Sequence, residues 1–183
     1  MGEIHVHEFM SLDGVVDEPT WTFEFGFTPR MGELIGGAMA GATALLLGRT
    51  TYQMFEPAWS TRTADDDPGA PFFNEGTKYV VSSTLVDPTW QNTTIVDGYE
   101  AGTIRRLKGE VAGGLYTSGS ATLVQALLAD GLVDELHLFV YPVTRGKGPR
   151  LFPAVPAAGA ISLQACEGLD NGVVYLNYRI AQR

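Results

Sequence analysis

The sequence predicts a single-domain α/β fold, and three observations support this prediction. Short apolar runs alternate with amphipathic stretches through most of the chain, which is typical of strands connected by helices. Several apolar runs end in small or hydroxyl-bearing residues that lead into a helical pattern. Two final apolar segments flank Asn171-Gly172, a good hairpin turn. We therefore expect residues 1–183 to form a central, mostly parallel sheet with an antiparallel C-terminal hairpin and helices on both faces.

The expected strands are apolar runs bounded by glycine, proline or polar residues. They cover residues 4–10, 43–47, 78–81, 93–96, a short run that begins at 115, 135–141, 161–167 and 173–180. The expected helices carry apolar residues at helical spacing. They cover residues 29 to about 42, 49–55, 101–108 and a stretch from the turn at 119 to 130. The proline-rich segment 56–76 is predicted to be a surface loop, with three aspartates at a solvated tip.

Composition limits the classes of function. The formal charge of −9 and the pI of about 4.7 argue against binding to nucleic acid, because phosphate backbones are bound by clustered Lys and Arg. A single cysteine, Cys166, excludes an intramolecular disulfide and a cysteine zinc site. The N-terminus carries no leader pattern, and the most apolar run, 34–47, is too short for a bilayer that needs about 20 residues. We expect a cytoplasmic protein with a small-molecule ligand and no membrane association.

The turn after the strand at 115 is a candidate anion-binding site. Gly119 and Ser120 lead into a helix whose first turn holds Ala121 and Thr122. Backbone N–H groups in such a turn lack intrahelical partners, and together with the helix dipole they favour an anion such as phosphate. Many α/β proteins use the same arrangement for packing alone, and the glycine spacing does not match the dinucleotide fingerprint.

Two other strand ends strengthen this prediction. These ends carry small and hydroxyl-bearing residues and one arginine, namely Gly48, Arg49, Thr50, Thr51, Ser82 and Ser83. The planar donors of Arg49 suit phosphate, and the threonine hydroxyls can cap a helix or bind an oxygen. A capped helix with a solvated arginine is the alternative. Because ligands of open α/β sheets bind at the carboxyl ends of the strands, three such ends can hold an extended, multiply phosphorylated molecule.

Two patterns near the N-terminus allow both a structural and a functional interpretation. His5 and His7 project to the same face of the first strand, but no third ligand follows at a recognisable spacing, so we predict no metal site. Aromatic residues alternate from Trp21 through Phe25 to Phe27 and would form one stripe if extended. This stripe would be a flap that closes the core, a dimer contact, or an apolar wall against which Trp21 and Phe25 bind a planar heterocycle.

Five motifs together resemble the C-terminal reductase domain of the riboflavin-biosynthesis deaminase/reductase and its stand-alone relatives, within the dihydrofolate reductase superfamily. They are Ser11-Leu12-Asp13-Gly14, Leu47-Gly48-Arg49-Thr50-Thr51-Tyr52, Val81-Ser82-Ser83-Thr84, Gly119-Ser120-Ala121-Thr122-Leu123 with Asp134-Glu135-Leu136, and Gly146-Lys147-Gly148-Pro149-Arg150-Leu151-Phe152. Each motif alone is weak, but their order along nearly the whole chain is specific.

This resemblance implies a dihydrofolate reductase-like fold that binds NADPH across the sheet. The turns at 48–51 and 119–122 would hold the pyrophosphate and nicotinamide half, and Ser82 and Ser83 would lie near the adenosine ribose and its 2′-phosphate. The substrate would lie between the Asp13 loop, the aromatic residues and the helix from Pro29. A homodimer is expected from the family.

The resemblance and the residues predict an NADPH-dependent oxidoreductase of the riboflavin biosynthesis type. Hydride would pass to a small polar or heterocyclic substrate, with Asp13 or Glu33 assisting protonation. Asp13 could equally be a turn residue. The alternative function is a non-catalytic nucleotide-, pterin- or flavin-binding module on the same fold. A substrate phosphate would need a second cationic site, for which the candidates are Arg30, Arg145, Lys147 and Arg150.

Overall fold

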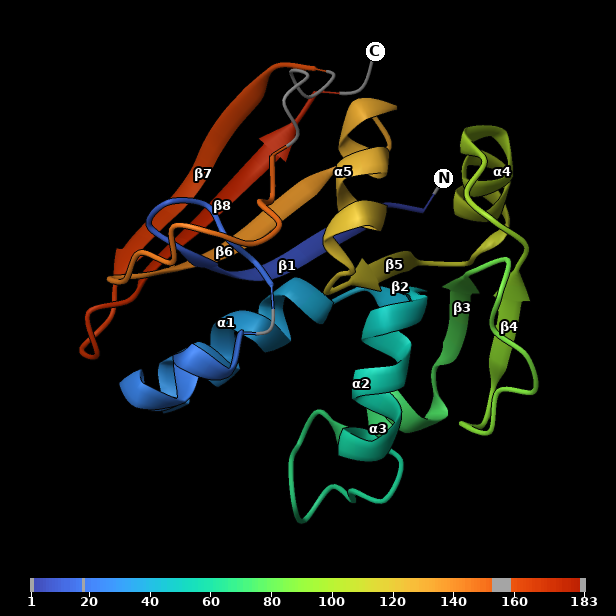
Figure 1. Cartoon of the computed structure of the whole chain (residues 1–183), viewed down its shortest axis with the longest axis horizontal. Coiled ribbons are helices and arrows are strands. Elements are labelled where there is room, and N and C mark those ends of the chain that lie inside the picture. The colour runs from blue at the N-terminus through green and yellow to red at the C-terminus, as the bar shows by residue number, and fades with distance from the viewer. Residues whose placement is uncertain (1, 18, 153–158, 182–183) are drawn as a thin grey trace.

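The computed structural model describes residues 2–17, 19–152 and 159–181. The strands are β1 (Ile4–Ser11), β2 (Ala42–Gly48), β3 (Thr77–Val81), β4 (Thr93–Val96), β5 (Gly114–Thr117), β6 (Glu135–Tyr141), β7 (Ile161–Gly168) and β8 (Val174–Ile180). The helices are the 3₁₀ helix η1 (Pro19–Phe25), α1 (Pro29–Met39), α2 (Arg49–Trp59), α3 (Ala70–Glu75), α4 (Ala101–Glu110) and α5 (Ala121–Ala129). Figure 1 shows these elements arranged around one sheet.

The sheet has the order β4-β3-β2-β5-β1-β6-β8-β7. All pairs from β4 to β6 are parallel, whereas β8 pairs antiparallel with β6 and with β7. The predicted mostly parallel sheet with an antiparallel C-terminal hairpin is therefore confirmed. The carboxyl ends of β3, β2, β5 and β1 follow one another along one edge, so the turns after them are neighbours.

Helices cover both faces of the sheet, as the alternation of strand side chains predicts. On one face Ile104 of α4 and Leu123 of α5 pack with Val6 and Leu46. On the opposite face Ala38 of α1 packs with residues of α2, α3 and β2. A third cluster on that face joins η1, α1, β6 and β8 through aromatic rings. The core thus lies in two layers, and the central strands β1, β2 and β5 are buried from both sides.

The N-terminal end of β1 is held by a buried ion pair. Lys108 Nζ lies 2.5 Å from Asp134 Oδ2, and both side chains are almost fully buried. The same oxygen accepts the N–H of Ile4 at 2.7 Å, while Lys108 Nζ also donates to the carbonyl of Leu132 at 3.2 Å. These bonds join α4, β1 and the residues that precede β6.

The prediction that 56–76 is a loop was wrong in part. Helix α2 continues to Trp59 and includes Pro57, although a proline at this position lacks the N–H of one helical bond. A further helix, α3, follows within the segment. Trp59 stacks on Phe73 with ring centroids 4.1 Å apart, so tertiary packing overrides the proline signal. The loop between the two helices carries the three aspartates, and they are exposed or half-exposed there.

The aromatic segment is not extended, which corrects the predicted stripe. It forms η1, in which the hydroxyl of Thr22 donates to the carbonyl of Pro19 at 2.6 Å. Trp21 and Phe25 both pack edge-on against Tyr141, whereas Phe23 is exposed. Helical turning therefore separates the rings that a strand would align.

None of the helices in the described ranges is long and apolar enough to cross a membrane.

Candidate functional site

The turns after β2 and β5 lie against each other at the carboxyl edge of the sheet. The N–H of Gly48 faces the carbonyl of Gly119 at 3.5 Å. A Cβ at position 48 would collide with the Ser120 hydroxyl, and one at position 119 would lie 2.7 Å from Thr51 Oγ1. Gly119 also has a φ of +93°, which favours glycine. We refer to residues 48–51 and 119–122 as the paired turns.

Both paired turns end in helix N-termini. Helix α2 begins at Arg49 and α5 at Ala121, and neither Gly48 nor Ser120 caps its helix with a side-chain hydrogen bond. The first N–H groups of two helices are thus presented at one place, where they favour an anion. Their hydroxyls differ in access, because Thr51 is buried while Thr50 is exposed.

Arg49 connects the paired turns to the segment after β3. Its Nη1 donates to the hydroxyl of Thr84 at 2.6 Å. Ser82 Oγ in turn accepts the N–H groups of Thr84 and Leu85 at 3.1 and 2.9 Å, which fixes this segment, while Ser83 is exposed beside it. The structure therefore brings the predicted residues at the ends of β2, β3 and β5 into one row.

Glu8 adds a buried carboxyl group beneath the paired turns. It lies on β1 with Oε1 3.9 Å from the position of a Cβ at Gly119. This oxygen is buried and has no hydrogen-bond partner among the described residues. Burial raises the pKa of Glu8 to about 8, so the group is mostly a neutral acid at pH 7. An unpartnered acid beside a row of bare N–H groups indicates a polar ligand at this position.

The predicted catalytic residue Asp13 holds two loops together. Its carboxylate accepts the N–H groups of Arg145 and Gly146 at 3.0 and 2.7 Å and the hydroxyl of Ser11 at 2.7 Å. The bond from Arg145, followed by those from Ser11 and Gly146, holds the pKa of Asp13 well below its ordinary value. Arg150 Nε also donates to the Asp13 carbonyl at 2.9 Å. The carboxylate is thus ionised and anchors the loop after β6.

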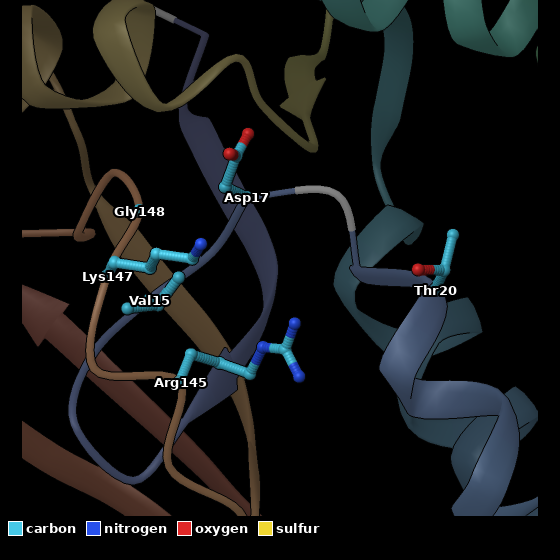
Figure 2. Close-up of a pocket in the computed structure, with 6 residues that line it drawn as sticks. All are labelled: Val15, Asp17, Thr20, Arg145, Lys147 and Gly148. Carbon is cyan, nitrogen blue, oxygen red and sulfur yellow. The ribbon is translucent and has the colours of Figure 1, made fainter.

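These two loops enclose a cavity of about 280 Å³ beside η1. Its lining comprises Val15, Asp17, Thr20, Arg145, Lys147 and Gly148. Figure 2 shows Arg145 and Lys147 extending from one loop toward the segment that carries Asp17 and Thr20. Of the four predicted phosphate candidates, only these two line the cavity. Arg150 bonds Asp13, and Arg30 pairs with Glu33 and Glu167 on the surface.

The other predicted site residues are Glu33, Trp21 and Phe25, and they belong to elements that cover the face of the sheet opposite to Glu8. Glu33 is exposed on α1, and one of its carboxylate oxygens lies 2.8 Å from Arg30 Nη1. Trp21 is buried and Phe25 half-buried, with ring centroids 5.3 and 5.4 Å from that of Tyr141. Within the described ranges, no hydrogen bond or ring contact joins these three residues to the paired turns. Their catalytic and substrate-binding roles stay predictions.

The sequence analysis missed two groups of residues, and the second includes His5, where it expected no metal site. Glu8 shares its strand face with Ile4 and Val6, so a charged residue on an apolar face was the signal that could have found it. The second group is His5, Glu135 and His137, which offer ligand atoms within 4.8 Å of one another. Sequence distance hid this cluster, because parallel pairing of β1 with β6 brings it together.

Comparison with known proteins assigns the chain to a family. The sequence pattern described as the RibD C-terminal domain matches residues 3–175. The chain belongs to the RibD C-terminal domain family. An uncharacterized protein of Bacillus subtilis strain 168, YyaP, is 24% identical over 179 residues, which are 92% of this chain and 90% of YyaP. Membership in the RibD C-terminal domain family supports a reductase-type function.

Solved structures similar to this chain share its fold. A putative riboflavin biosynthesis protein from Shewanella sp. PV-4 has a TM-score of 0.74 at 18% identity, with full coverage of both chains. A pyrimidine reductase-like protein from Corynebacterium diphtheriae gives 0.62 at 12%, covering 100% of this chain and 93% of that one. Dihydrofolate reductase from Enterococcus faecalis, complexed with NADP(H) and RAB-propyl, gives 0.64 at 14%, covering 99% and 98%. The fold is therefore dihydrofolate reductase-like.

Proposed function

We propose that this protein is an NADPH-dependent reductase that transfers hydride to a small polar or heterocyclic substrate. The substrate class resembles that of 5-amino-6-(5-phosphoribosylamino)uracil reductase of riboflavin biosynthesis. The observation that carries the proposal is the contact between the paired turns, which presents two helix N-termini and Arg49 along one sheet edge. The family match and the NADP(H) complex of the similar dihydrofolate reductase support it.

The residues present fit a dinucleotide. The bare N–H groups at Arg49–Thr51 and at Ala121 and Thr122 suit a pyrophosphate, and Gly48 and Gly119 leave room where a Cβ would intrude. Arg49, held by Thr84, and the hydroxyl groups of Ser82 and Ser83 suit a 2′-phosphate.

NADPH, when bound, supplies the hydride, and the protein supplies position and a water-poor environment. Glu8 is the buried acid next to Gly119 and, as a neutral group, can donate a hydrogen bond to an oxygen of the ligand. Asp13 holds the loop after β6 in place and thereby positions Arg145. Glu33 is exposed and paired with Arg30, so its proposed part in protonation would be to hold a water that donates the proton.

The substrate would bind next to the loops that Asp13 joins. Arg145 and Lys147 line the cavity of about 280 Å³ and offer donors for an anionic group such as a phosphate. Trp21 and Phe25 of η1 would form an apolar wall, and both rings pack against Tyr141. A phosphorylated ring-opened sugar with a polar heterocycle matches this combination of charged and aromatic groups.

We also propose that the protein forms a homodimer through the closing hairpin. Strand β7 lies at the edge of the sheet, and its residues Ile161 and Leu163 are exposed. Exposed apolar side chains on an edge strand favour association with another chain. Sedimentation of the wild type and of Leu163→Lys tests this. If the dimer forms through β7, the sedimenting mass should fall from that of a dimer to that of a monomer in the variant.

Turnover tests the proposed reductase directly. Purified protein is mixed with NADPH and a panel of flavin-pathway and pterin compounds, and loss of the near-ultraviolet absorbance of NADPH is followed. Oxidation that depends on both protein and substrate supports the proposal. Binding of NADPH without turnover of any compound would instead favour the non-catalytic nucleotide-, pterin- or flavin-binding module. Failure to bind NADPH would contradict both.

A further inference from the structure

Parallel pairing of β1 with β6 creates a cluster of imidazole and carboxylate groups. In this register His5 lies opposite Glu135, and His7 lies opposite His137. His5, Glu135 and His137 point to the face of the sheet that α1 covers, and each offers one ligand atom within 4.8 Å of the others. All three side chains are largely shielded from solvent, with exposed fractions of 14%, 18% and 7%. This burial distinguishes them from solvated surface charges.

Both ring nitrogens of His5 have hydrogen-bond partners. Nδ1 lies 3.1 Å from the carbonyl oxygen of Ala38, which can only accept, so Nδ1 carries the proton. The other nitrogen, Nε2, lies 3.1 Å from Glu3 Oε2. A divalent cation that displaced the proton of this contact would lie between two acceptors, the imidazole nitrogen and the carboxylate oxygen.

His137 has a similar outer partner. Its Nδ1 lies 2.7 Å from the hydroxyl of Tyr175, and its Nε2 lies 3.2 Å from Glu135 Oε2. An outer hydrogen bond to one ring nitrogen is what orients a metal-binding histidine.

Arg179 organises the carboxylates without filling the cluster. It donates to Glu135 Oε1 at 2.7 Å and also bonds Glu3 Oε1. Both Oε2 atoms face the histidines, and Glu135 Oε2 also accepts an N–H of the Asn177 side chain at 3.3 Å. The two carboxylates and the guanidinium together carry a net charge of −1, so the local charge favours a further cation.

A route to the cluster exists at the amino ends of the strands. A cavity of about 170 Å³ is lined there by Glu3 and His5 and by the backbone-exposing glycines 2, 41, 113 and 114. The paired turns lie at the opposite ends of the strands. Ser11 lies six positions after His5 along β1, which is about 20 Å in an extended strand. The cluster is thus a separate site.

We propose that His5, Glu135 and His137 bind a divalent transition-metal ion of the Zn²⁺ class, with Glu3 as the adjacent fourth donor. Imidazole nitrogens and a carboxylate oxygen are ligands that Zn²⁺ prefers. Tetrahedral Zn²⁺ needs its ligand atoms about 3.4 Å apart, so the site closes by small side-chain rotations from the 4.8 Å limit. The ion would tie β1 to β6 at the end of the sheet opposite the paired turns.

The test measures metal binding and not activity. The parent protein for this test is prepared without an affinity tag and with the substitution Cys166→Ser, because the exposed thiol of Cys166 is a competing metal ligand. Zn²⁺ affinity is measured by competition with a chromophoric chelator, and Co²⁺ supplies an absorption spectrum that reports coordination geometry. We expect one equivalent of Zn²⁺ and a tetrahedral Co²⁺ spectrum with imidazole ligation.

Two ligand variants and one control complete the design. His5→Ala and Glu135→Gln should each weaken Zn²⁺ binding at least about tenfold and remove the tetrahedral spectrum. Glu110→Gln, an exposed acid on α4, should change neither. Circular dichroism confirms that each variant is folded. Binding that survives both ligand substitutions, or no binding by the parent protein, would overturn the proposal. Because no readout involves NADPH, this outcome is independent of the reductase proposal.

Discussion

Gly48 and Ser120, from two different strand–helix turns, touch each other at the carboxyl edge of the sheet. A Cβ at position 48 would collide with the Ser120 hydroxyl and lie 3.2 Å from the Ser120 backbone nitrogen. The φ of Gly48 is −79°, so any residue could adopt this backbone and only the space requires glycine. The paired turns therefore depend on a close approach that a single methyl group disturbs.

Gly48→Ala should weaken NADPH binding at least about tenfold, or 1.4 kcal/mol, because the added methyl pushes the two helix N-termini apart. The matched control is Gly36→Ala in α1, where an added Cβ meets nothing within 4 Å. Alanine at position 36 should leave affinity unchanged and stabilise the helix by about 0.5–1 kcal/mol. Fluorescence titration with NADPH measures both variants. Equal affinities of Gly48→Ala and the wild type would show that the paired turns do not hold the cofactor.

Glu8→Gln should stabilise the protein at neutral pH. Burial raises the pKa of Glu8 from 4.5 to about 8, so the folded state holds a proton that the unfolded state releases above pH 4.5. Stability therefore falls as the pH rises from 4.5 to 8, and at pH 7 this costs about 3 kcal/mol. The neutral amide removes the cost.

Thermal unfolding at two pH values isolates this effect. Relative to their difference at pH 4, the Glu8→Gln variant should gain about 6 to 12 °C over the wild type at pH 7. A difference that stays constant between the two pH values would mean that Glu8 is ionised in the folded protein.

Asp13→Asn should loosen the loop after β6. The carboxylate accepts two backbone N–H groups, and an amide would turn its own donor toward one of them. Because the folded pKa of Asp13 is lowered, its contribution to stability is present above the ordinary pKa of 3.8 and is lost as the pH falls through the folded value. The loop contact should thus be insensitive to pH between about 5 and 9.

Hydrogen exchange at the amides of Arg145 and Gly146 tests the Asp13 contact. Faster exchange of these two amides in Asp13→Asn, with unchanged NADPH affinity, supports a positioning role in the substrate cavity. Unchanged exchange together with lost turnover would instead support direct participation of Asp13 in proton transfer.

Breaking the buried pair of Lys108 and Asp134 should be strongly destabilising. Either Lys108→Met or Asp134→Ala leaves an uncompensated buried charge, which costs about 3–5 kcal/mol. Glu110→Ala, on the exposed surface of α4, should stay within about 0.5 kcal/mol of the wild type. Urea unfolding gives all three values. A loss below about 1 kcal/mol in both pair variants would mean that the pair is hydrated in solution.

Local patterns predicted much of the fold. The alternation of residues in β1 and β6 and the Asn-Gly turn before β8 indicate the strands and the hairpin directly, because strand periodicity and turn chemistry act over a few residues. The extension of α2 past Pro57 and the helical state of Trp21–Phe25 were not predicted. Both depend on rings packed from distant segments, such as Phe73 and Tyr141.

Only those residues of the candidate site that directly follow the end of a strand could be predicted from the sequence. Gly48 and Gly119 could be identified from their turns, since the ends of neighbouring parallel strands meet at one edge. Glu8 and the pairing of His5 with Glu135 require the strand order β5-β1-β6, which the local sequence does not contain. Asp13 could be singled out from the sequence, but its bonds to Arg145 and Gly146 join residues more than 130 positions apart.

The most direct test of the central claim compares the dissociation constants of NADPH and NADH for the wild type and for Arg49→Met. Arg49, held by Thr84 beside Ser82 and Ser83, is proposed to contact the 2′-phosphate that only NADPH carries. The wild type should bind NADPH at least about tenfold more tightly than NADH, and Arg49→Met should abolish most of this difference. Equal affinity of the wild type for both nucleotides, or binding of neither, would contradict the account.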